Sequence, residues 1–316
     1  MILDNINLMF EQHPTSWVVT LAVISLMMGS FLNVVIHRLP KMLEKSWYCD
    51  CRELLADELS TDKESKNAKS TSSKPRPYTA TETYNLVVPN STCPKCQQAI
   101  KPWQNIPIVS WLFLRGKCAS CANPISMRYP VVELITGLMG GFAAWHFGYS
   151  FAAVAALVFT FCLIAMTFID FDTMLLPDQL TLPLLWLGLL VNTQATFVNL
   201  NDAVIGAVIG YLSLWSIFWL FKLLTGKEGM GYGDFKLLAA LGAWMGYQAL
   251  LPIILISSFV GAILGIIILK TQSANKAEEN ENGATAIPFG PYLAIAGWIA
   301  FYWRDDLIQY YVTHFL

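Results

Sequence analysis

The sequence predicts an all-α polytopic membrane protein with about eight transmembrane helices and a cytoplasmic, zinc-ribbon-like insert. Of its 316 residues, 55% are hydrophobic and only 13% are charged, which excludes an ordinary soluble domain. Apolar runs recur along the chain at or near the roughly 20 residues that cross a bilayer as a helix. Two Cys-x-x-Cys pairs lie in the longest polar stretch between these runs.

Eight apolar runs are predicted as spans. The sixth is short, and Pro252 is taken as the boundary between it and the seventh. Because the first run is long and no small-residue cleavage site follows it, we expect a retained anchor and not a cleaved signal peptide. In chain order the runs cover 15–37, 130–148, 151–169, 179–198, 203–224, 235–249, 251–270 and 287–303.

The distribution of positive charge predicts the orientation of these spans. With the N-terminus outside, the segments 38–129, 170–178, 225–234 and 271–286 face the cytoplasm. All of the 20 Lys and Arg residues except Arg304 then lie on that side, when residues at the ends of spans are included. The opposite orientation would violate the positive-inside rule almost completely.

Four of the seven cysteines are spaced like the ligands of a metal ion. Cys93 and Cys96 form one Cys-x-x-Cys pair, and Cys118 and Cys121 form another. Two such pairs suit tetrahedral coordination of zinc by thiolates. Two disulfides are the alternative, but a cytoplasmic location opposes them because that compartment keeps thiols reduced. Four thiolates leave no open position on the metal, so we predict a structural zinc site.

Other parts of the cytoplasmic insert carry less specific patterns. Ser60–Tyr78 is polar and charged, so we expect a flexible linker. Ile106–Leu114 is apolar but too short to cross a bilayer, so it either rests on the membrane or packs against the ribbon. A second polar stretch, Thr271–Thr285, is predicted to be a loop between the last two spans.

Three aspartates follow the third apolar run, and they differ in context. Asp178 follows Pro177 and precedes an apolar run, which indicates a helix N-cap. Asp172 lies in the connecting turn, where solvated acids are common. Asp170 is joined directly to the end of the preceding span. A carboxylate at the edge of the hydrocarbon is costly and marks a functional site, although a simple polar helix end would also explain this residue.

A fourth carboxylate, Asp234, follows three alternating glycines at 229, 231 and 233. Glycine permits tight turns and close approach of a partner chain. Asp234 then opens the next helical run, where the helix dipole favours an ionised acid. A nucleotide-binding loop is excluded because no strand or βαβ unit precedes these glycines. An N-cap alone would not require three glycines.

The pair Asp170 and Asp234 suits acid–base chemistry. Two carboxylates brought close together share one proton. The ionised member can take a proton from water while the protonated member polarises a peptide carbonyl. Metal binding by the same pair is the alternative, but it would require further carboxylate or His ligands, and none stands out at a fixed offset.

The first span also carries polar residues on one helical face. Ser30, Asn33 and His37 recur at helical spacing. Polar groups inside a membrane normally face the interior of the bundle. We interpret these residues as helix–helix hydrogen-bonding groups and not as catalytic ones.

Several motifs along the chain together resemble those of the type IV prepilin peptidases. They occur in the order of that family and cover nearly the whole chain apart from 42–80 and 271–285. The motifs are Gly29–Pro40, the four cysteines, Arg128-Tyr129-Pro130-Val131-Val132-Glu133-Leu134, the segment from Asp170 to Leu176-Pro177-Asp178, and Gly229–Lys236.

The resemblance implies an aspartic protease of the Gly-x-Gly-Asp type in the bacterial inner membrane, with its active site facing the cytoplasm. Such enzymes remove the basic leader of type IV prepilins and of the pseudopilins of type II secretion, cutting after a glycine. By this resemblance the catalytic residues are Asp170 and Asp234. Gly231, Gly233 and Lys236 of the matching motif would support the loop and the substrate.

Many members of the family then methylate the new N-terminal amine with S-adenosylmethionine, an activity associated with the cytoplasmic insert. Arg115-Gly116-Lys117-Cys118 resembles the stretch linked to methyl transfer. The resemblance therefore implies a second activity, with Gly116 and Lys117 as its candidate residues. Zinc would be structural, and S-adenosylmethionine would be the methyl donor.

The expected organisation is an N-terminal transmembrane helix at 1–40, a cytoplasmic insert with the zinc site at 41–129, and a membrane-embedded protease core at 130–316. The expected partners are prepilins, pseudopilins and membrane lipid, and no nucleic acid. Three alternatives stay open: a peptidase without methyl transfer, a proton-coupled transporter, and a membrane scaffold that uses the ribbon to hold a partner. A transporter would favour acids nearer the bilayer midplane and an internal repeat, and a scaffold would leave the glycine-rich loop without a purpose.

Overall fold

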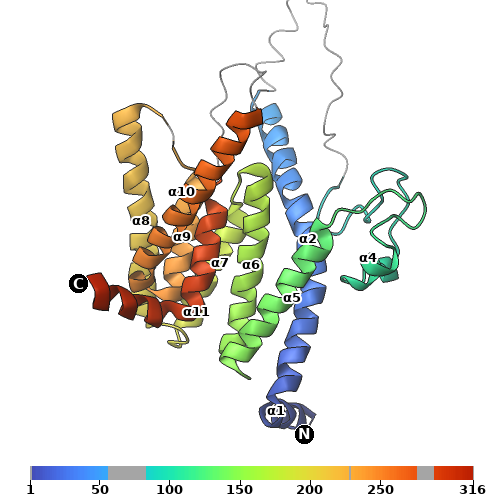
Figure 1. Cartoon of the computed structure of the whole chain (residues 1–316), viewed down its shortest axis with the longest axis horizontal. Coiled ribbons are helices and arrows are strands. Elements are labelled where there is room, and N and C mark those ends of the chain that lie inside the picture. The colour runs from blue at the N-terminus through green and yellow to red at the C-terminus, as the bar shows by residue number, and fades with distance from the viewer. Residues whose placement is uncertain (1, 56–82, 228, 276–287, 316) are drawn as a thin grey trace, which may run out of the picture.

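The computed structural model describes residues 2–55, 83–227, 229–275 and 288–315 (Figure 1). The segment 60–78, predicted to be a flexible linker, lies outside these residues. The predicted loop Thr271–Thr285 is described only at its start, where residues 271–275 continue a helix.

The described residues are mostly helical, which confirms the all-α part of the predicted fold class. They contain no β-strand, only two isolated β-bridges in the insert. In chain order the helices are α1 (Ile2–Gln12), α2 (Pro14–Leu54), η2 (Pro102–Asn105), α4 (Val109–Phe113), α5 (Arg128–Phe147), α6 (Phe151–Thr173), α7 (Asp178–Asn192), α8 (Leu200–Thr225), α9 (Tyr232–Met245), η3 (Tyr247–Ala249), α10 (Leu250–Asn275) and α11 (Gly290–Phe315).

Within the described residues, four helical segments are long and apolar enough to cross a membrane: Pro14–Leu54, Phe151–Thr173, Leu200–Thr225 and Tyr247–Ile267. Helix α2 continues to Leu54, well past the end of the predicted first span at residue 37. The extension is rich in Lys, Glu and Arg, which have high helix propensity in water, so the helix can continue beyond the bilayer. The short helix α1 was not predicted.

Helix α9 occupies the centre of the bundle, and nearly all of its side chains are buried. It packs against α7, α8 and α11. Trp244 Nε1 donates to the Leu184 carbonyl at 2.8 Å, and Asn192 Nδ2 donates to the Ala243 carbonyl at 2.9 Å. These bonds satisfy buried polar groups across the α7–α9 contact and fix the position of α9.

Glycines bring α8 and α9 into close contact. A Cβ added to Gly210 would lie 2.7 Å from the Leu238 carbonyl oxygen, and Gly206 lies directly against the backbone of Gly242. Helix association inside a membrane depends on such small residues, because lipid provides little hydrophobic drive between helices. The close contact holds α9 against α8, as the hydrogen bonds hold it against α7.

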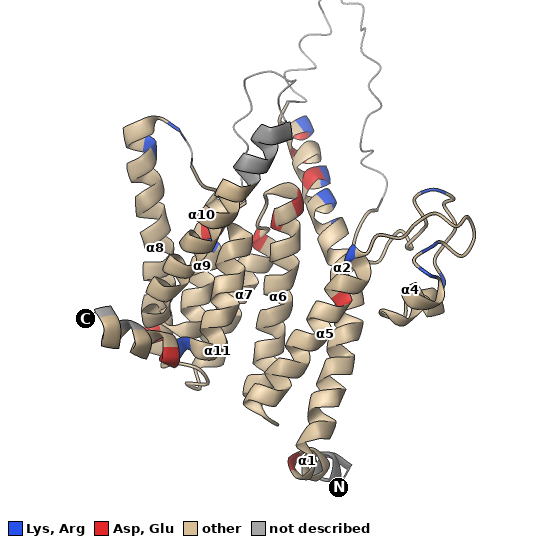
Figure 2. Ribbon diagram, viewed as in Figure 1, with Lys and Arg blue, Asp and Glu red and all other residues tan. Residues whose placement is uncertain are grey.

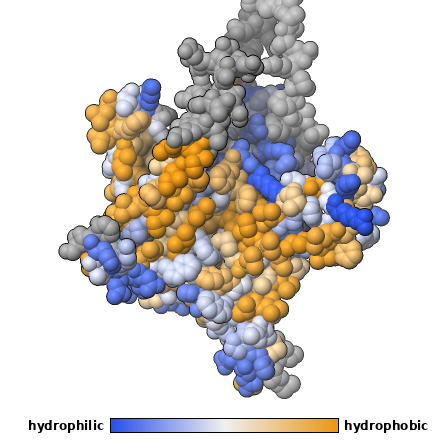
Figure 3. Space-filling view, viewed as in Figure 1, coloured by the Kyte–Doolittle hydropathy of each residue, from blue (hydrophilic) through white to orange (hydrophobic). Residues whose placement is uncertain are grey.

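The charged residues gather toward the ends of the bundle (Figure 2). Apolar residues cover much of the middle of the face shown in Figure 3. Large apolar side chains exposed on the helices include Leu138 on α5, Leu212 on α8 and Phe259 on α10. An apolar surface of this extent marks a membrane protein or an interaction surface.

Candidate active site

Asp170 lies in the last turn of α6 and is only 5% exposed. The helix ends at Thr173 because Met174 adopts a left-handed conformation, and the Met174 backbone N–H closes the helix onto the Asp170 carbonyl at 2.9 Å. The position of Asp170 is therefore set by the rigid helix and by its C-cap.

Asp234 lies in the first turn of α9 and is 6% exposed. Gly231 is the N-cap, which places Asp234 at the third helical position. The Asp234 carboxylate accepts a hydrogen bond from the backbone N–H of Gly231. This is one half of a capping box, in which an acid at the third position satisfies the N-cap amide. The glycine loop therefore determines where the carboxylate points.

The two carboxylates come from different helices and lie within electrostatic range of each other. The Asp170 carboxylate accepts a hydrogen bond from the backbone N–H of Gly290, the first residue of α11. A Cβ added to Gly290 would lie 2.5 Å from Asp170 Oδ2 and 2.9 Å from Leu176 Cδ1. A Cβ added to Gly233 would lie 2.6 Å from Leu176 Cβ. Leu176 thus packs between the two glycines.

Gly290 is a residue of this site that sequence reasoning missed. It lies in Phe289-Gly290-Pro291, at the start of the last apolar run. A glycine followed by a proline at the start of a helix could have indicated this residue. The proline fixes the backbone there, and the glycine lets another group pack closely against it. The sequence could not show which side chain approaches it.

Two ion pairs flank the carboxylates, each two residues further along the chain. Arg128 Nη1 lies 2.7 Å from the Asp172 carboxylate, and its Nη2 donates to the Phe168 carbonyl at 3.3 Å. Lys236 Nζ lies 2.6 Å from Asp178 Oδ1. The predicted N-cap role of Asp178 is wrong, because Pro177 occupies the N-cap position and the Asp178 side chain binds Lys236.

The four cysteines of the two pairs converge as their spacing predicts. The Sγ atoms of Cys93, Cys96, Cys118 and Cys121 all lie within 4.8 Å of one another, and those of Cys93 and Cys121 are 3.8 Å apart. Zinc–sulfur bonds of about 2.3 Å in a tetrahedron place sulfurs about 3.8 Å apart. The donor set and its spacing therefore fit a zinc ion.

The backbone of the two knuckles repeats. The N–H of Gln97 donates to the Cys93 carbonyl, and that of Ala122 donates to the Cys118 carbonyl. Both Gln97 and Ala122 have positive φ angles, 59° and 54°. Backbone hydrogen bonds from Cys96 and Lys95 lower the pKa of the Cys93 thiol to about 6, which favours the thiolate that binds metal.

Gly116 and Lys117 lie at the second knuckle, and their described contacts are within the insert and not with the two aspartates. Gly116 has φ +67°, and a Cβ there would lie 2.8 Å from the ring of Trp111. Lys117 forms an antiparallel bridge with Pro124. Glycine at 116 is therefore required by local packing. Cys49 and Cys51 lie on α2 and Cys162 lies on α6, outside the four-cysteine cluster.

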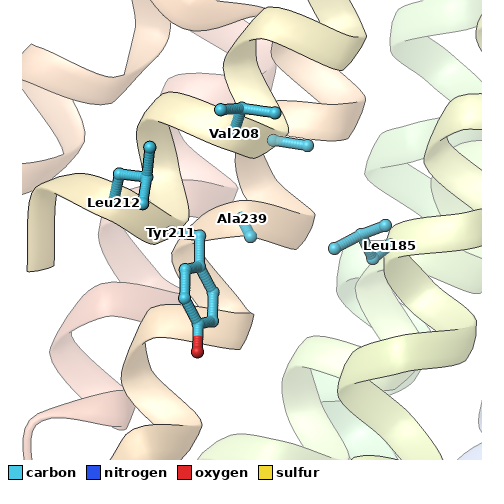
Figure 4. A pocket seen from close by; sticks show the side chains of 6 residues that line it. Leu185, Val208, Tyr211, Leu212 and Ala239 are labelled. Atoms are coloured by element: carbon cyan, nitrogen blue, oxygen red, sulfur yellow. The ribbon is translucent and has the colours of Figure 1, made fainter. Parts of the chain in front are cut away.

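An open apolar groove of about 350 Å³ lies between α7 and α8, with α9 as its floor (Figure 4). None of the predicted site residues lines it. Ala239 in its floor is five residues from Asp234, or about 7.5 Å along the helix. Its lining consists of Leu185, Ala207, Val208, Tyr211, Leu212 and Ala239.

Family comparisons match both halves of the chain. Residues 23–147 match the bacterial peptidase A24 N-terminal domain, and residues 157–266 match the type IV leader peptidase family. The first match contains the four cysteines and the Arg128–Leu134 motif. The second contains Asp170, Asp234 and the glycine loop, but not Gly290.

The chain is also similar over nearly its full length to proteins named prepilin leader peptidase/N-methyltransferase. The one from Pseudomonas aeruginosa is 55% identical over 300 residues, which are 95% of each chain. Those from Aeromonas hydrophila and Neisseria gonorrhoeae are 53% identical (92% of each chain) and 47% identical (93% of this chain and 94% of the relative). No solved structure matches the chain.

Proposed function

Because this chain belongs to the type IV leader peptidase family, we propose that it is a membrane-embedded aspartic endopeptidase that removes the leader of prepilins and pseudopilins. Asp170 and Asp234 are the proposed catalytic residues. The observation that carries the proposal is that these two buried carboxylates, 64 positions apart, meet at one site. Burying two acids together is costly, and such a cost is kept where chemistry requires it.

The proposed mechanism is general acid–base hydrolysis. Two neighbouring carboxylates hold one proton between them, since both cannot ionise cheaply at short range. The ionised acid removes a proton from a water molecule as its oxygen attacks the scissile carbonyl carbon. The protonated acid donates its proton to the carbonyl oxygen. As the tetrahedral intermediate collapses and the C–N bond breaks, the acid that took the proton of water gives it to the leaving amine, and a hydroxyl of the intermediate returns a proton to the other acid. The dyad is thus restored without a covalent enzyme intermediate.

Gly231, Gly233 and Lys236 act in this proposal as supports of the site. The Gly231 N–H orients the Asp234 carboxylate, and the missing Cβ of Gly233 leaves room for Leu176. Lys236 binds Asp178 and so joins the start of α9 to the start of α7. Each contact restricts the movement of Asp234, and precise placement of an acid is worth orders of magnitude in rate.

The proposed topology has eight spans with the N-terminus outside and the active site at the cytoplasmic face of the bacterial inner membrane. The support is that each of the eight predicted apolar runs overlaps a described helix, and four of the described helical segments are long and apolar enough to cross a membrane. The positive-inside rule supports this orientation. We retain the proposed domains at 1–40, 41–129 and 130–316, with the addition that α2 continues as one helix across the first boundary.

The proposed second activity is N-methylation of the new N-terminal residue with S-adenosylmethionine. The name that the relatives carry supports it. Zinc held by Cys93, Cys96, Cys118 and Cys121 would contribute structure, since four thiolates complete its coordination. Gly116 and Lys117 stay proposed for methyl transfer, with Gly116 acting through the fold of the ribbon.

The test uses purified full-length protein, a prepilin and S-adenosylmethionine. We expect leader removal by the wild type and a loss of roughly 100- to 10,000-fold in Asp170→Asn and Asp234→Asn, as for removal of a general acid or base. Mass spectrometry of the mature N-terminus reads out methylation separately. Asp172→Asn is the matched control and should retain most of the cleavage activity, because Asp172 lies in the same last turn of α6 as Asp170 but pairs with Arg128. Full processing by either dyad variant would end the assignment.

A further inference from the structure

The insert carries an exposed apolar segment, residues 102–114, that neither proposed reaction uses. It comprises η2, α4 and the residues that join them. Trp103, Leu112 and Phe113 are all exposed, and Phe113 is 84% exposed. An open groove of about 280 Å³ runs between η2 and α4 and is lined mainly by apolar side chains of this segment. Exposed apolar surface of this kind marks a contact with a partner or a membrane.

A buried carboxylate holds this segment to the helix bundle. The Ile108 backbone N–H donates to Glu133 Oε2 at 2.8 Å, and Glu133 on α5 is only 7% exposed. The Ser30 side chain on α2 also hydrogen-bonds to Glu133. Ile108 has φ +59°, a conformation that a β-branched residue rarely adopts. The hydrogen bond to Glu133 is one of the contacts that hold this strained residue in place.

The position of Glu133 gives the depth of the segment. Arg128 begins α5 and pairs with Asp172 near the end of α6, so these charges mark one edge of the bundle. Glu133 is five residues further along α5, or about 7.5 Å from that edge. Figure 1 shows α4 alongside α5 and not beyond its end. Interfacial segments bury their apolar face about 5–10 Å into the boundary of headgroups and acyl chains.

The composition around the segment fits a membrane surface that carries negative charge. Lys101 precedes it, and Arg115 and Lys117 follow it. Lys101 Nζ lies 5.1 Å from the ring centroid of Trp103, which pairs a cation with an interfacial aromatic residue. Basic residues next to aromatic ones are typical of the cytoplasmic headgroup region, where anionic lipids attract them.

The apolar surface of the bundle continues beside this segment. On α5, Leu134 and Leu138 are exposed, and Leu134 directly follows the residue that binds Ile108. On α2, Met27 and Phe31 are exposed next to Ser30 and the α5 contact. Figure 3 shows apolar surface on both the bundle and the insert. A bilayer that covers the helices would also reach residues 102–114.

We propose that residues 102–114 are a membrane anchor of the insert, inserted into the cytoplasmic leaflet and held there by Glu133. The occupant of the exposed apolar surface is phospholipid, with the basic residues at both ends of the segment next to anionic headgroups. This proposal rests on the proposed orientation of the spans. The anchor fixes the height of the zinc ribbon relative to the bundle.

Photo-crosslinking of the full-length protein tests this proposal. Phe113→p-benzoylphenylalanine is irradiated in nanodiscs of phosphatidylethanolamine and phosphatidylglycerol, and adducts are identified by mass. We expect phospholipid adducts at position 113. The matched control is Val87→p-benzoylphenylalanine, at an apolar residue of the same insert that is 76% exposed. Val87 is expected to lie further from the lipid than Phe113. The carbonyl of Asn85, two residues before Val87, accepts a hydrogen bond from Arg38, which lies eight residues beyond Ser30 on α2, or about 12 Å further toward the cytoplasm.

The role of Glu133 is tested in the same labelled protein. Glu133→Ala removes the acceptor of the Ile108 N–H and should lower the yield of lipid adducts at position 113, whereas Glu133→Gln keeps an acceptor oxygen and should retain them. Equal adduct yields in the Ala variant and the wild type would overturn the role of Glu133.

Three outcomes would overturn the anchor itself: no lipid adduct at position 113, equal lipid adducts at positions 113 and 87, or crosslinks at position 113 only to a second copy of the chain. The readout is a lipid mass and needs no enzyme activity. Failure of leader cleavage by the wild type would therefore refute the proposed function and leave this result standing.

Discussion

Lys236 on α9 and Asp178 on α7 form an ion pair, with Nζ 2.6 Å from Oδ1 and 2.8 Å from Oδ2. Asp178 is the first residue of α7, and Lys236 is the fifth residue of α9. Lys236 is two residues from Asp234, and Asp178 is two residues from Leu176, which packs against Gly233. The pair therefore joins the two segments that surround the Asp234 carboxylate.

Loss of this ion pair is expected to slow leader cleavage modestly. Because the Asp178 side chain is about half exposed, solvent screening limits the pair to about 0.5–1 kcal/mol, or a few-fold in rate. Lys236→Met and Asp178→Asn should each lower kcat, and the double variant should be no slower than the slower single variant. A double-mutant cycle measured with a prepilin tests this coupling. Strictly additive losses would show that the two side chains act independently.

A Cβ at position 290 is expected to displace the Asp170 carboxylate. In Gly290→Ala the new atom would meet Asp170 Oδ2 at 2.5 Å and Leu176 Cδ1 at 2.9 Å. A displacement of about 1 Å can cost about 100-fold in rate, so kcat should fall to that extent. The measurement is leader cleavage, with the thermal unfolding midpoint as a check on folding. Gly148→Ala is the control, because nothing lies within 4 Å of a Cβ there, although its φ of +62° adds local strain.

Removal of zinc ligands is expected to affect methyl transfer more than cleavage. Cys93→Ser and Cys118→Ser each remove one thiolate from the cluster, so the zinc content of purified protein should fall. The ribbon should then lose order while the dyad, which lies on the helices, stays assembled. Metal analysis and the two activities measured on one preparation test this. Cys162→Ser on α6 is the control, and a zinc content in the ligand variants equal to the wild type would refute the site.

Substitution of Gly116 is expected to damage the ribbon and not a chemical step. In Gly116→Ala the new Cβ would lie 2.8 Å from the Trp111 ring, at a φ of +67° that alanine rarely adopts. Methyl transfer should fall, and Trp111→Ala in the same chain should restore part of it by making room. Lys117→Met tests the charge of the neighbouring residue without this clash. No recovery in the double variant would indicate that Gly116 acts in another way.

Several features were predictable because they depend on spacing along the chain. The all-helical fold follows from the apolar runs and is confirmed. The convergence of the four cysteines follows from the repeated Cys-x-x-Cys spacing and is confirmed as a cluster of thiols. Zinc occupancy, the roles of the aspartates and the count of eight spans stay predictions.

Contacts between distant segments were not predictable in the same way. Asp178 was expected to cap its own helix, but its carboxylate binds Lys236 from another helix. The extent of α2 was underestimated because its polar residues 41–54 were assigned to the cytoplasmic insert, although they favour helix. Gly290 was not singled out, because its neighbour Asp170 lies 120 positions away in the sequence.

The sequence by itself determined the helical class, the repeated cysteine pairs and the local geometry of Asp234, whose glycine N-cap lies three residues away. These features depend on helical period, short spacing and backbone freedom, which are properties of neighbouring residues. Only the tertiary structure decided that the end of α6, the start of α9 and the start of α11 meet around two buried carboxylates. The physical reason is that apolar helix faces resemble one another in sequence, so their partners are selected by close packing of particular glycines and large side chains across the whole bundle.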